Sequence, residues 1–139
     1  MPLRVAECRC GKLRLKCDGE PQGVSVCHCL ECQRRTGSAF AVQASYATAD
    51  VTIEGTSRLY RKTGDSGMWA RYHFCPNCGS TVYYENEDTP GVFAVPVGAF
   101  ADPTFPIPQR SIYEDRMHPW TGVAGEAVHH ERQSEASNK

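Results

Sequence analysis

The stretch that decides the fold is Cys75-Pro-Asn-Cys-Gly79, in which two residues separate a pair of cysteines. Two thiolates at this spacing can face one metal ion across a tight turn, because Pro76 fixes φ and Gly79 tolerates a positive φ. Candidate strands flank the turn at residues 68–74 and 81–84. The stretch therefore predicts a hairpin whose tip holds zinc. A redox Cys-x-x-Cys is the alternative, but that use is typical of a βαβ context, which is absent here.

A structural zinc site needs a second pair of ligands, and Cys8-Arg-Cys-Gly11 supplies one that also ends in glycine. We expect these cysteines to join the hairpin and to complete a four-thiolate site. A closed thiolate shell leaves the metal no open position, so such a site stabilises the fold and does not catalyse. The predicted ligands are Cys8, Cys10, Cys75 and Cys78.

A third cluster, Cys27-His-Cys-Leu-Glu-Cys32, has no fourth cysteine nearby. Three protein ligands are typical of an open, reactive zinc site, whose free position could take water, His28, Glu31 or the thiol of a small molecule. A thiol held there would become a nucleophile at neutral pH. Arg34 and Arg35 could bind carboxylates of a ligand or could simply be the solvated face of a short helix. A second structural site, completed by a histidine, is the alternative.

Length and composition favour one small soluble domain. The chain has 139 residues and a formal net charge of -1, with 40% hydrophobic and 22% charged residues, so neither a disordered chain nor a nucleic-acid or membrane partner is expected. The start lacks the apolar run of a signal peptide, and no stretch approaches a membrane span. We therefore expect the cytosol, where clustered cysteines bind metals more often than they form disulfides.

The spacing of short apolar segments predicts a small, mostly antiparallel β fold. Lys12-Leu-Arg-Leu-Lys-Cys17 alternates strictly, which places Cys17 in the core, without a ligand role. One short helix is expected at residues 29–35, ended by Gly37. The single domain is expected to span residues 1–123, followed by a mobile tail at 124–139. Further strands are expected at residues 39–46, 51–53, 58–61 and 92–97, and surface histidines at His73, His118, His129 and His130.

Taken together, the three cysteine clusters, the sequence Cys32-Gln-Arg-Arg-Thr-Gly37 and the late Pro119-Trp120 resemble the glutathione-dependent formaldehyde-activating enzyme family, whose domain type centromere protein V shares. The resemblance covers residues 3–123. It implies a mainly β, Mss4-like zinc-binding fold, with two antiparallel sheets in a tent arrangement and one short helix. It also implies two zinc ions per chain, the first held by the four-cysteine set as a structural site and the second at a catalytic site formed by Cys27, Cys29 and Cys32.

The resemblance further implies an activity, that of a carbon–sulfur lyase of the S-(hydroxymethyl)glutathione synthase type. Such an enzyme joins formaldehyde, or a related carbonyl compound, to the thiol of glutathione as co-substrate. Glutathione carries two carboxylates, for which Arg34 and Arg35 are the expected anchors. The alternative function is a non-enzymatic two-zinc module for protein interaction.

Overall fold

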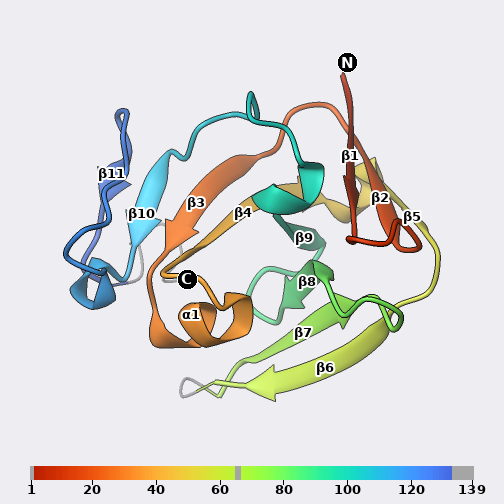
Figure 1. Cartoon of the computed structure of the whole chain (residues 1–139), viewed down its shortest axis with the longest axis horizontal. Helices are drawn as coiled ribbons and strands as arrows, with labels where there is room; N and C mark the ends of the chain where they lie inside the picture. The colour runs from red at the N-terminus through yellow and green to blue at the C-terminus, as the bar shows by residue number, and fades with distance from the viewer. Residues whose placement is uncertain (1, 65–66, 133–139) are drawn as a thin grey trace. The chain divides into compact units, whose positions relative to one another are not determined.

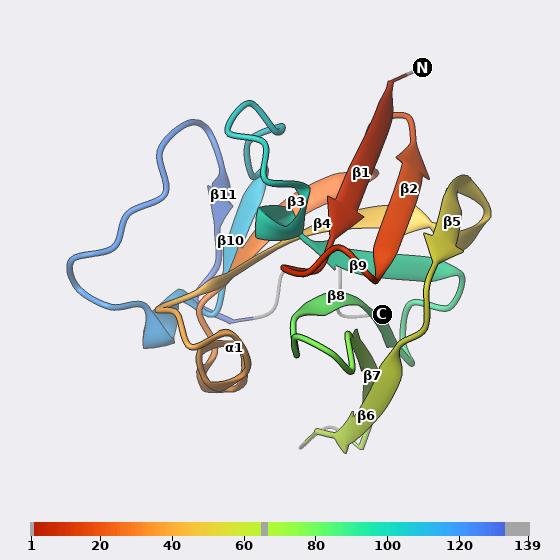
Figure 2. The same ribbon diagram turned by 45° about the vertical axis from the view of Figure 1, so that its right-hand side comes forward.

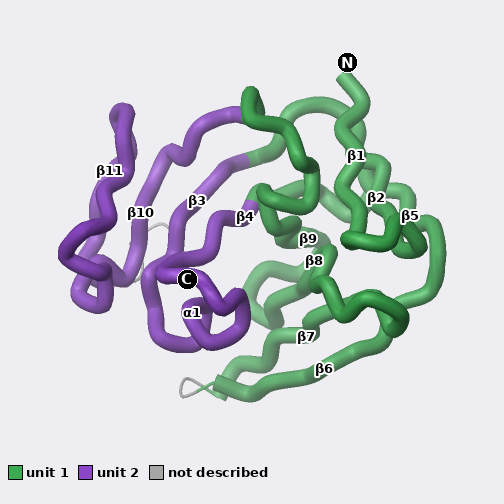
Figure 3. The backbone as a smooth tube through the Cα atoms, viewed as in Figure 1, with its two compact units in different colours: residues 1–22, 44–105 green, residues 23–43, 106–139 purple. Residues whose placement is uncertain are grey.

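The computed structural model describes residues 2–64 and 67–132 and is mainly β. The chain separates into two compact units, one made of residues 1–22 and 44–105 and the other of residues 23–43 and 106–139 (Figure 3). The expectation of two sheets with one short helix is confirmed. The single domain expected over residues 1–123 stays a prediction. Within the described ranges, no helix has the length and apolar character needed to cross a membrane.

The first unit contains a three-stranded antiparallel sheet in the order β1-β2-β5 (Figure 2). Its strands are β1 (Leu3–Glu7), β2 (Arg14–Asp18) and β5 (Val51–Glu54). The alternation expected in β2 is confirmed, because Leu15 and Cys17 are fully buried while their neighbours face outward. The outward side chains form ion pairs across the sheet, Arg14 to Glu7 at 3.1 Å and Lys16 to Glu54 at 3.0 Å.

The remaining strands of the first unit run in the order β4-β9-β8-β7-β6, with the end of β4 in this unit (Figure 1). Their bounds are β4 (Ala41–Ala47), β6 (Arg58–Thr63), β7 (Trp69–Phe74), β8 (Thr81–Asn86) and β9 (Val92–Pro96). Tyr46, Val82 and Val95 lie in the core of the unit, and the Tyr46 hydroxyl donates to the carbonyl oxygen of Gly19 at 3.2 Å. The β7–β8 hairpin thus presents the predicted Cys-x-x-Cys turn at its tip.

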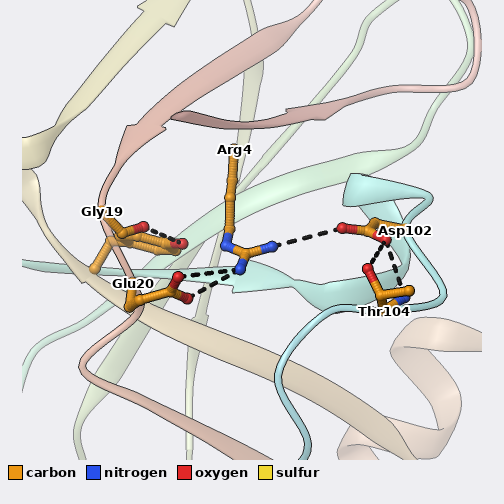
Figure 4. A network of polar contacts seen from close by, with 6 residues as sticks. Arg4, Gly19, Glu20, Asp102 and Thr104 are labelled. Carbon is orange, nitrogen blue, oxygen red and sulfur yellow. Dashed lines mark hydrogen bonds and ion pairs between the residues drawn. The ribbon is translucent and has the colours of Figure 1, made fainter. Parts of the chain in front are cut away.

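Arg4 fixes β1 to two other segments of the first unit (Figure 4). Its guanidinium binds both carboxylate oxygens of Glu20, at 3.0 and 3.2 Å, and reaches Asp102 at 3.5 Å. Asp102 in turn accepts from the backbone and hydroxyl of Thr104, at 2.9 and 2.7 Å. The guanidinium also lies over the Phe105 ring. Because β1 leads directly into the first cysteine pair, this network helps to place that pair.

The second unit contains β3 (Gly23–Cys27), the start of β4, β10 (Arg110–Ile112) and β11 (Val128–His129), in the order β11-β10-β3-β4. β10 pairs in parallel with both β3 and β11, so these pairs depart from the antiparallel pairing that the resemblance implies, within a fold that is otherwise mostly antiparallel as expected. A parallel pair needs a long connection, and the chain between β3 and β10 supplies it. Short 3-10 helices occur at Thr48–Asp50, Val97–Phe100 and Glu114–Arg116.

Helix α1 (Leu30–Thr36) follows β3 and confirms the helix expected there. Gly37 ends it in the left-handed conformation, with φ of 71°, and its N–H donates to the Gln33 carbonyl. The mobility of the tail expected from residue 124 stays a prediction. Within it the Val128 and His130 amides donate to the carbonyls of Gln109 and Ser111, both at 2.9 Å. Its remainder, residues 133–139, lies outside the described residues.

Two cysteine clusters as candidate metal centres

The first unit brings Cys8, Cys10, Cys75 and Cys78 together, with all four sulfur atoms within 4.8 Å of one another. Each pair sits in a tight turn closed by backbone hydrogen bonds. The Cys8 amide donates to the Leu13 carbonyl and the Cys75 amide to the Ser80 carbonyl, both at 2.9 Å. The glycines that end the two turns, Gly11 and Gly79, each have φ of 82°, which a side chain would disfavour.

Sulfur separations in this cluster fit a tetrahedral metal. Cys10 Sγ lies 3.6 Å from Cys8 Sγ and 3.7 Å from Cys75 Sγ. Four sulfurs at the usual zinc–sulfur distance of about 2.3 Å would be separated by about 3.8 Å. Backbone amides also point at the sulfurs, Leu13 N–H at Cys8 (3.2 Å) and Asn77 N–H at Cys75 (3.4 Å). All eight cysteines are free thiols, so the donor set fits a structural zinc site.

Hydrogen bonds favour the thiolate at two of these four positions. The side chain and then the backbone of Ser80 lower the pKa of Cys78 to about 5. A hydrogen bond from the Asn77 side chain, followed by one from the Lys12 backbone, lowers the pKa of Cys10. The turns therefore supply negative charge for a cation from their own polar groups.

The second unit brings the three cysteines of the other cluster together, again with their sulfurs within 4.8 Å of one another. Cys27 ends β3 and is buried, whereas Cys29 and Cys32 are partly exposed. Cys29 is the N-cap of α1, and its sulfur accepts from the Cys32 amide at 3.3 Å. The cluster is therefore assembled by the end of one strand and the first turn of one helix, with one side open to solvent.

Hydrogen bonds within this cluster favour the thiolate at Cys29 over its neighbours. Hydrogen bonds with the thiols of Cys27 and then Cys32 lower the pKa of Cys29. Hydrogen bonds with Cys29 and then Cys32, followed by burial, raise the pKa of Cys27. At Cys32, a hydrogen bond with Cys27 and the nearby charge of Arg35 lower the pKa, but the Cys29 thiol and burial outweigh them and raise it to about 11. A cation bound here would stabilise all three sulfurs as thiolates, so that no thiolate would need a hydrogen bond from a neighbouring thiol.

His28, considered from the sequence as a fourth ligand, points elsewhere. Its ring is fully buried, and Nε2 lies 2.9 Å from the Ser111 hydroxyl. Within the described residues, the group of ligand atoms around the three sulfurs includes neither a His28 nitrogen nor a Glu31 carboxylate oxygen. Burial also lowers the pKa of His28, which disfavours the charged ring. In this structure the cluster has three side-chain ligands.

Gln33 and Tyr113 are site residues that the sequence did not reveal. The Gln33 amide donates to the carbonyls of His28 (2.8 Å) and Arg116 (3.1 Å), and its oxygen lies 2.9 Å from Nε2 of His118. Gln33 thus ties the cysteine loop to the chain that follows β10. Tyr113 begins that chain, one residue after Ile112, the register partner of Cys27. Burial, and then the charges of Cys27 and Cys29, raise the pKa of Tyr113. No local spacing signalled either contact, because the partners are far apart in sequence.

Other predicted residues lie as follows. Arg34 is exposed on α1, and Arg35 is partly exposed and close enough to Cys32 to act on its charge. His73 is not a surface residue, because it lies between Glu85 Oε2 at 2.8 Å and Ser57 Oγ at 3.2 Å with 16% of its side chain exposed. Trp120, part of the Pro119-Trp120 pair quoted for the family resemblance, is 73% exposed.

Comparisons with known proteins agree with this geometry. An uncharacterized lyase of Schizosaccharomyces pombe is 30% identical over 84 residues, which cover 60% of this chain and 58% of that protein, so the chain spans little more than half of the relative. A crystal structure of a Rhodobacter sphaeroides protein matches with a TM-score of 0.53 and 23% identity, over 68% of this chain and 85% of that one, which indicates a shared fold. Residues 4–116 match the family described as glutathione-dependent formaldehyde-activating enzyme, and the chain belongs to this family.

Proposed function

We propose that the protein is a zinc-dependent carbon–sulfur lyase that joins formaldehyde, or a related carbonyl compound, to a glutathione-type thiol at Cys27, Cys29 and Cys32. One observation carries the proposal. Among the described residues, this cluster offers three sulfurs, whereas the cluster of the first unit offers four. Three ligands with one exposed side are typical of catalytic zinc sites, and four thiolates of structural ones.

Zinc bound at the three-cysteine cluster would supply a cationic centre that stabilises a thiolate at neutral pH and polarises a carbonyl group. The three cysteines would hold it. In the reaction, the thiol sulfur bonds to the carbonyl carbon, the carbon–oxygen π bond breaks, and the oxygen takes the proton that the thiol gives up. The reverse reaction cleaves the carbon–sulfur bond, which is lyase chemistry.

The residues around the cluster support a thiol substrate that carries carboxylates. Cys29 and Cys32 are partly exposed, so a ligand can approach from their side. Arg34 and Arg35 lie on the same short helix, and we propose them as anchors for the glutathione carboxylates. The buried His28 ring lies against the Ser111 hydroxyl and so leaves the cluster to a substrate.

The other zinc ion, a structural one, is proposed to be held by Cys8, Cys10, Cys75 and Cys78. Glutathione and an aldehyde are the proposed partners, with the cytosol as the proposed location. Support for the substrates comes from the family to which residues 4–116 belong, and support for the reaction class from the lyase name of the yeast relative.

The test is the rate of S-hydroxymethylglutathione formation from formaldehyde and glutathione, measured by exchange NMR with zinc-loaded protein. We expect clear acceleration over the uncatalysed rate, lost in Cys29→Ser and retained in Cys17→Ala. Cys17 is the matched control, because it is the one cysteine outside both clusters. No acceleration by the wild-type protein would contradict the proposal and favour the non-enzymatic interaction module.

A further inference from the structure

Tyr113 has an unfavourable backbone conformation for its type. In the part of the chain that the structure describes, two non-glycine residues adopt a positive φ, Ala101 with φ of 49° and Tyr113 with φ of 58°. A bulky aromatic residue rarely occupies this left-handed region. Such conformations persist where the surroundings impose them, and they are concentrated at functional sites.

The parallel pairing of β10 with β3 places Tyr113 beside the three-cysteine cluster. Ile112 is the register partner of Cys27, and the His28 amide donates to the Ile112 carbonyl at 3.1 Å. Since parallel strands end at the same edge of a sheet, the residue after Ile112 meets the loop that follows Cys27. The two strands therefore deliver Tyr113 and the first ligand of the cluster to one edge.

The chain on both sides holds this conformation in place. The Tyr113 amide donates to the Arg132 carbonyl at 3.0 Å, and its own carbonyl accepts from the Arg116 amide at 3.1 Å. The Arg116 carbonyl accepts in turn from the side chain of Gln33, which also binds the His28 carbonyl within the cysteine loop. Gln33 therefore links the turn that Tyr113 begins to the loop that carries the cluster.

Core packing does not account for the strain. Ser111 and Ile112, which precede Tyr113, are buried, whereas Tyr113 itself is half-buried. A tyrosine that only filled the core would be enclosed like its neighbours. Its side chain instead stays partly exposed, one residue after the register partner of Cys27.

We propose that Tyr113 is a catalytic residue of the three-cysteine site, whose phenol O–H donates a hydrogen bond to the oxygen of the carbonyl substrate. This inference rests on the proposed function. As the carbon–sulfur bond forms, the carbon–oxygen π pair moves onto that oxygen, which finally carries the proton lost by the thiol. The phenol keeps its own proton throughout. A donor aimed at the oxygen stabilises the charge that develops there.

The experiment compares Tyr113→Phe with wild-type protein and with Tyr60→Phe, which removes the hydroxyl of an exposed tyrosine in the first unit. Measurements are the exchange rate with formaldehyde and glutathione, zinc per chain, the urea unfolding midpoint and the affinity for glutathione alone by calorimetry. We expect kcat/KM to fall about 10- to 100-fold in Tyr113→Phe only. Zinc content, unfolding midpoint and glutathione affinity should stay unchanged, and a structural role would move at least one of them.

A second readout does not depend on turnover. Adding formaldehyde to the glutathione-bound protein should perturb the tyrosine absorption of the wild-type protein and of Tyr60→Phe, but not that of Tyr113→Phe. If wild-type protein accelerates the reaction and Tyr113→Phe matches it within twofold, the role of Tyr113 is wrong while the proposed function stands. If wild-type protein gives no acceleration, both are wrong.

Discussion

The two cysteine clusters differ in how far apart in the sequence their ligands lie. The four-cysteine cluster joins the end of β1 to the tip of the β7–β8 hairpin, with Cys10 and Cys75 separated by 65 positions. The three-cysteine cluster takes all its ligands from one strand end and the adjoining helix turn. Closing a long loop constrains the unfolded chain more than closing a short one. Metal at the first cluster should therefore stabilise the fold more than metal at the second.

The clusters differ also in the polar groups beside them. Backbone amides and Ser80 surround the four sulfurs of the first cluster within its own turns. The second cluster depends on Gln33 and on chain that follows β10. A site whose supporting polar groups lie in its own turns suits a permanently bound metal. A site supported by a separate segment can combine metal binding with substrate contacts.

Removing a ligand of the four-cysteine cluster should have the largest effect. We expect Cys75→Ala to lose one zinc ion and the cooperative folding of the first unit, because structural zinc contributes about 10 kcal/mol or more, against total stabilities of about 5–15 kcal/mol. Circular dichroism melting with zinc analysis measures this. Melting like that of the wild-type protein would contradict the structural role.

The corresponding change in the other cluster should spare the fold. We expect Cys29→Ser to lose one zinc ion and all activity while keeping the helix N-cap, because serine caps helices well. Cys29→Ala should lose the cap as well and be less stable than Cys29→Ser by about 1 kcal/mol. Urea unfolding compares the two variants. Destabilisation as large as that of Cys75→Ala would show that both clusters are structural.

Substitution of Gln33 tests whether metal binding at the second cluster depends on the chain that follows β10. Gln33→Glu keeps the shape but cannot donate to the His28 and Arg116 carbonyls, so zinc affinity at this cluster should fall about 10- to 100-fold. Competition with a chelator measures it, and zinc at the first cluster should stay unchanged. Gln43→Glu is the control, because Gln43 lies in the same unit but binds Ser25. Equal losses in both variants would contradict the role of Gln33.

Cys17 shows how one buried thiol outside both clusters should make the stability of the fold depend on pH. Burial, and then the charge of Asp18, raise the pKa of Cys17 from 9.0 to about 11. Above pH 9 the unfolded chain loses this proton while the folded chain keeps it, so stability falls as pH rises to 11, by about 2 kcal/mol. Urea unfolding from pH 8 to 11 should show a shallower decline for Cys17→Ala than for wild-type protein. Parallel declines would contradict the prediction.

The smallest effect is expected at the arginines of α1. Arg35 acts on Cys32 and Arg34 is exposed, so Arg35→Gln should raise KM for glutathione about three- to tenfold, and Arg34→Gln less. Steady-state kinetics at fixed formaldehyde measure both variants. A larger rise in KM for Arg34→Gln than for Arg35→Gln would contradict the proposal that Arg35 is the stronger anchor.

Much of this structure could be predicted from local sequence. Strict alternation revealed β2, turn residues bounded β4 to β9, and Gly37 marked the end of α1. The two cysteine pairs and the triplet followed from local spacing, and the four-ligand requirement of structural zinc predicted that the two distant pairs would meet. The structure brings together the same seven cysteines that the spacing grouped.

The rest depends on pairing between distant segments. β10 and β11 have three and two residues, too short for any alternation to be seen, and exist because each pairs with a neighbouring strand. β3 is buried at almost every position and shows no alternation. Gln33 contacts chain 83 positions away, which no local pattern reports.

The sulfur that caps α1 is also a proposed metal ligand. Because of this dual role, the first turn of the helix should report whether the three-cysteine cluster holds a metal. Cys29 Sγ accepts from the Cys32 amide, so any bond that draws electron density from the sulfur weakens that acceptor. Amide hydrogen exchange at the first turn of α1 should therefore change when metal or a competing thiol binds. A single backbone proton can then follow the chemistry of the cluster without a coloured metal or a labelled substrate.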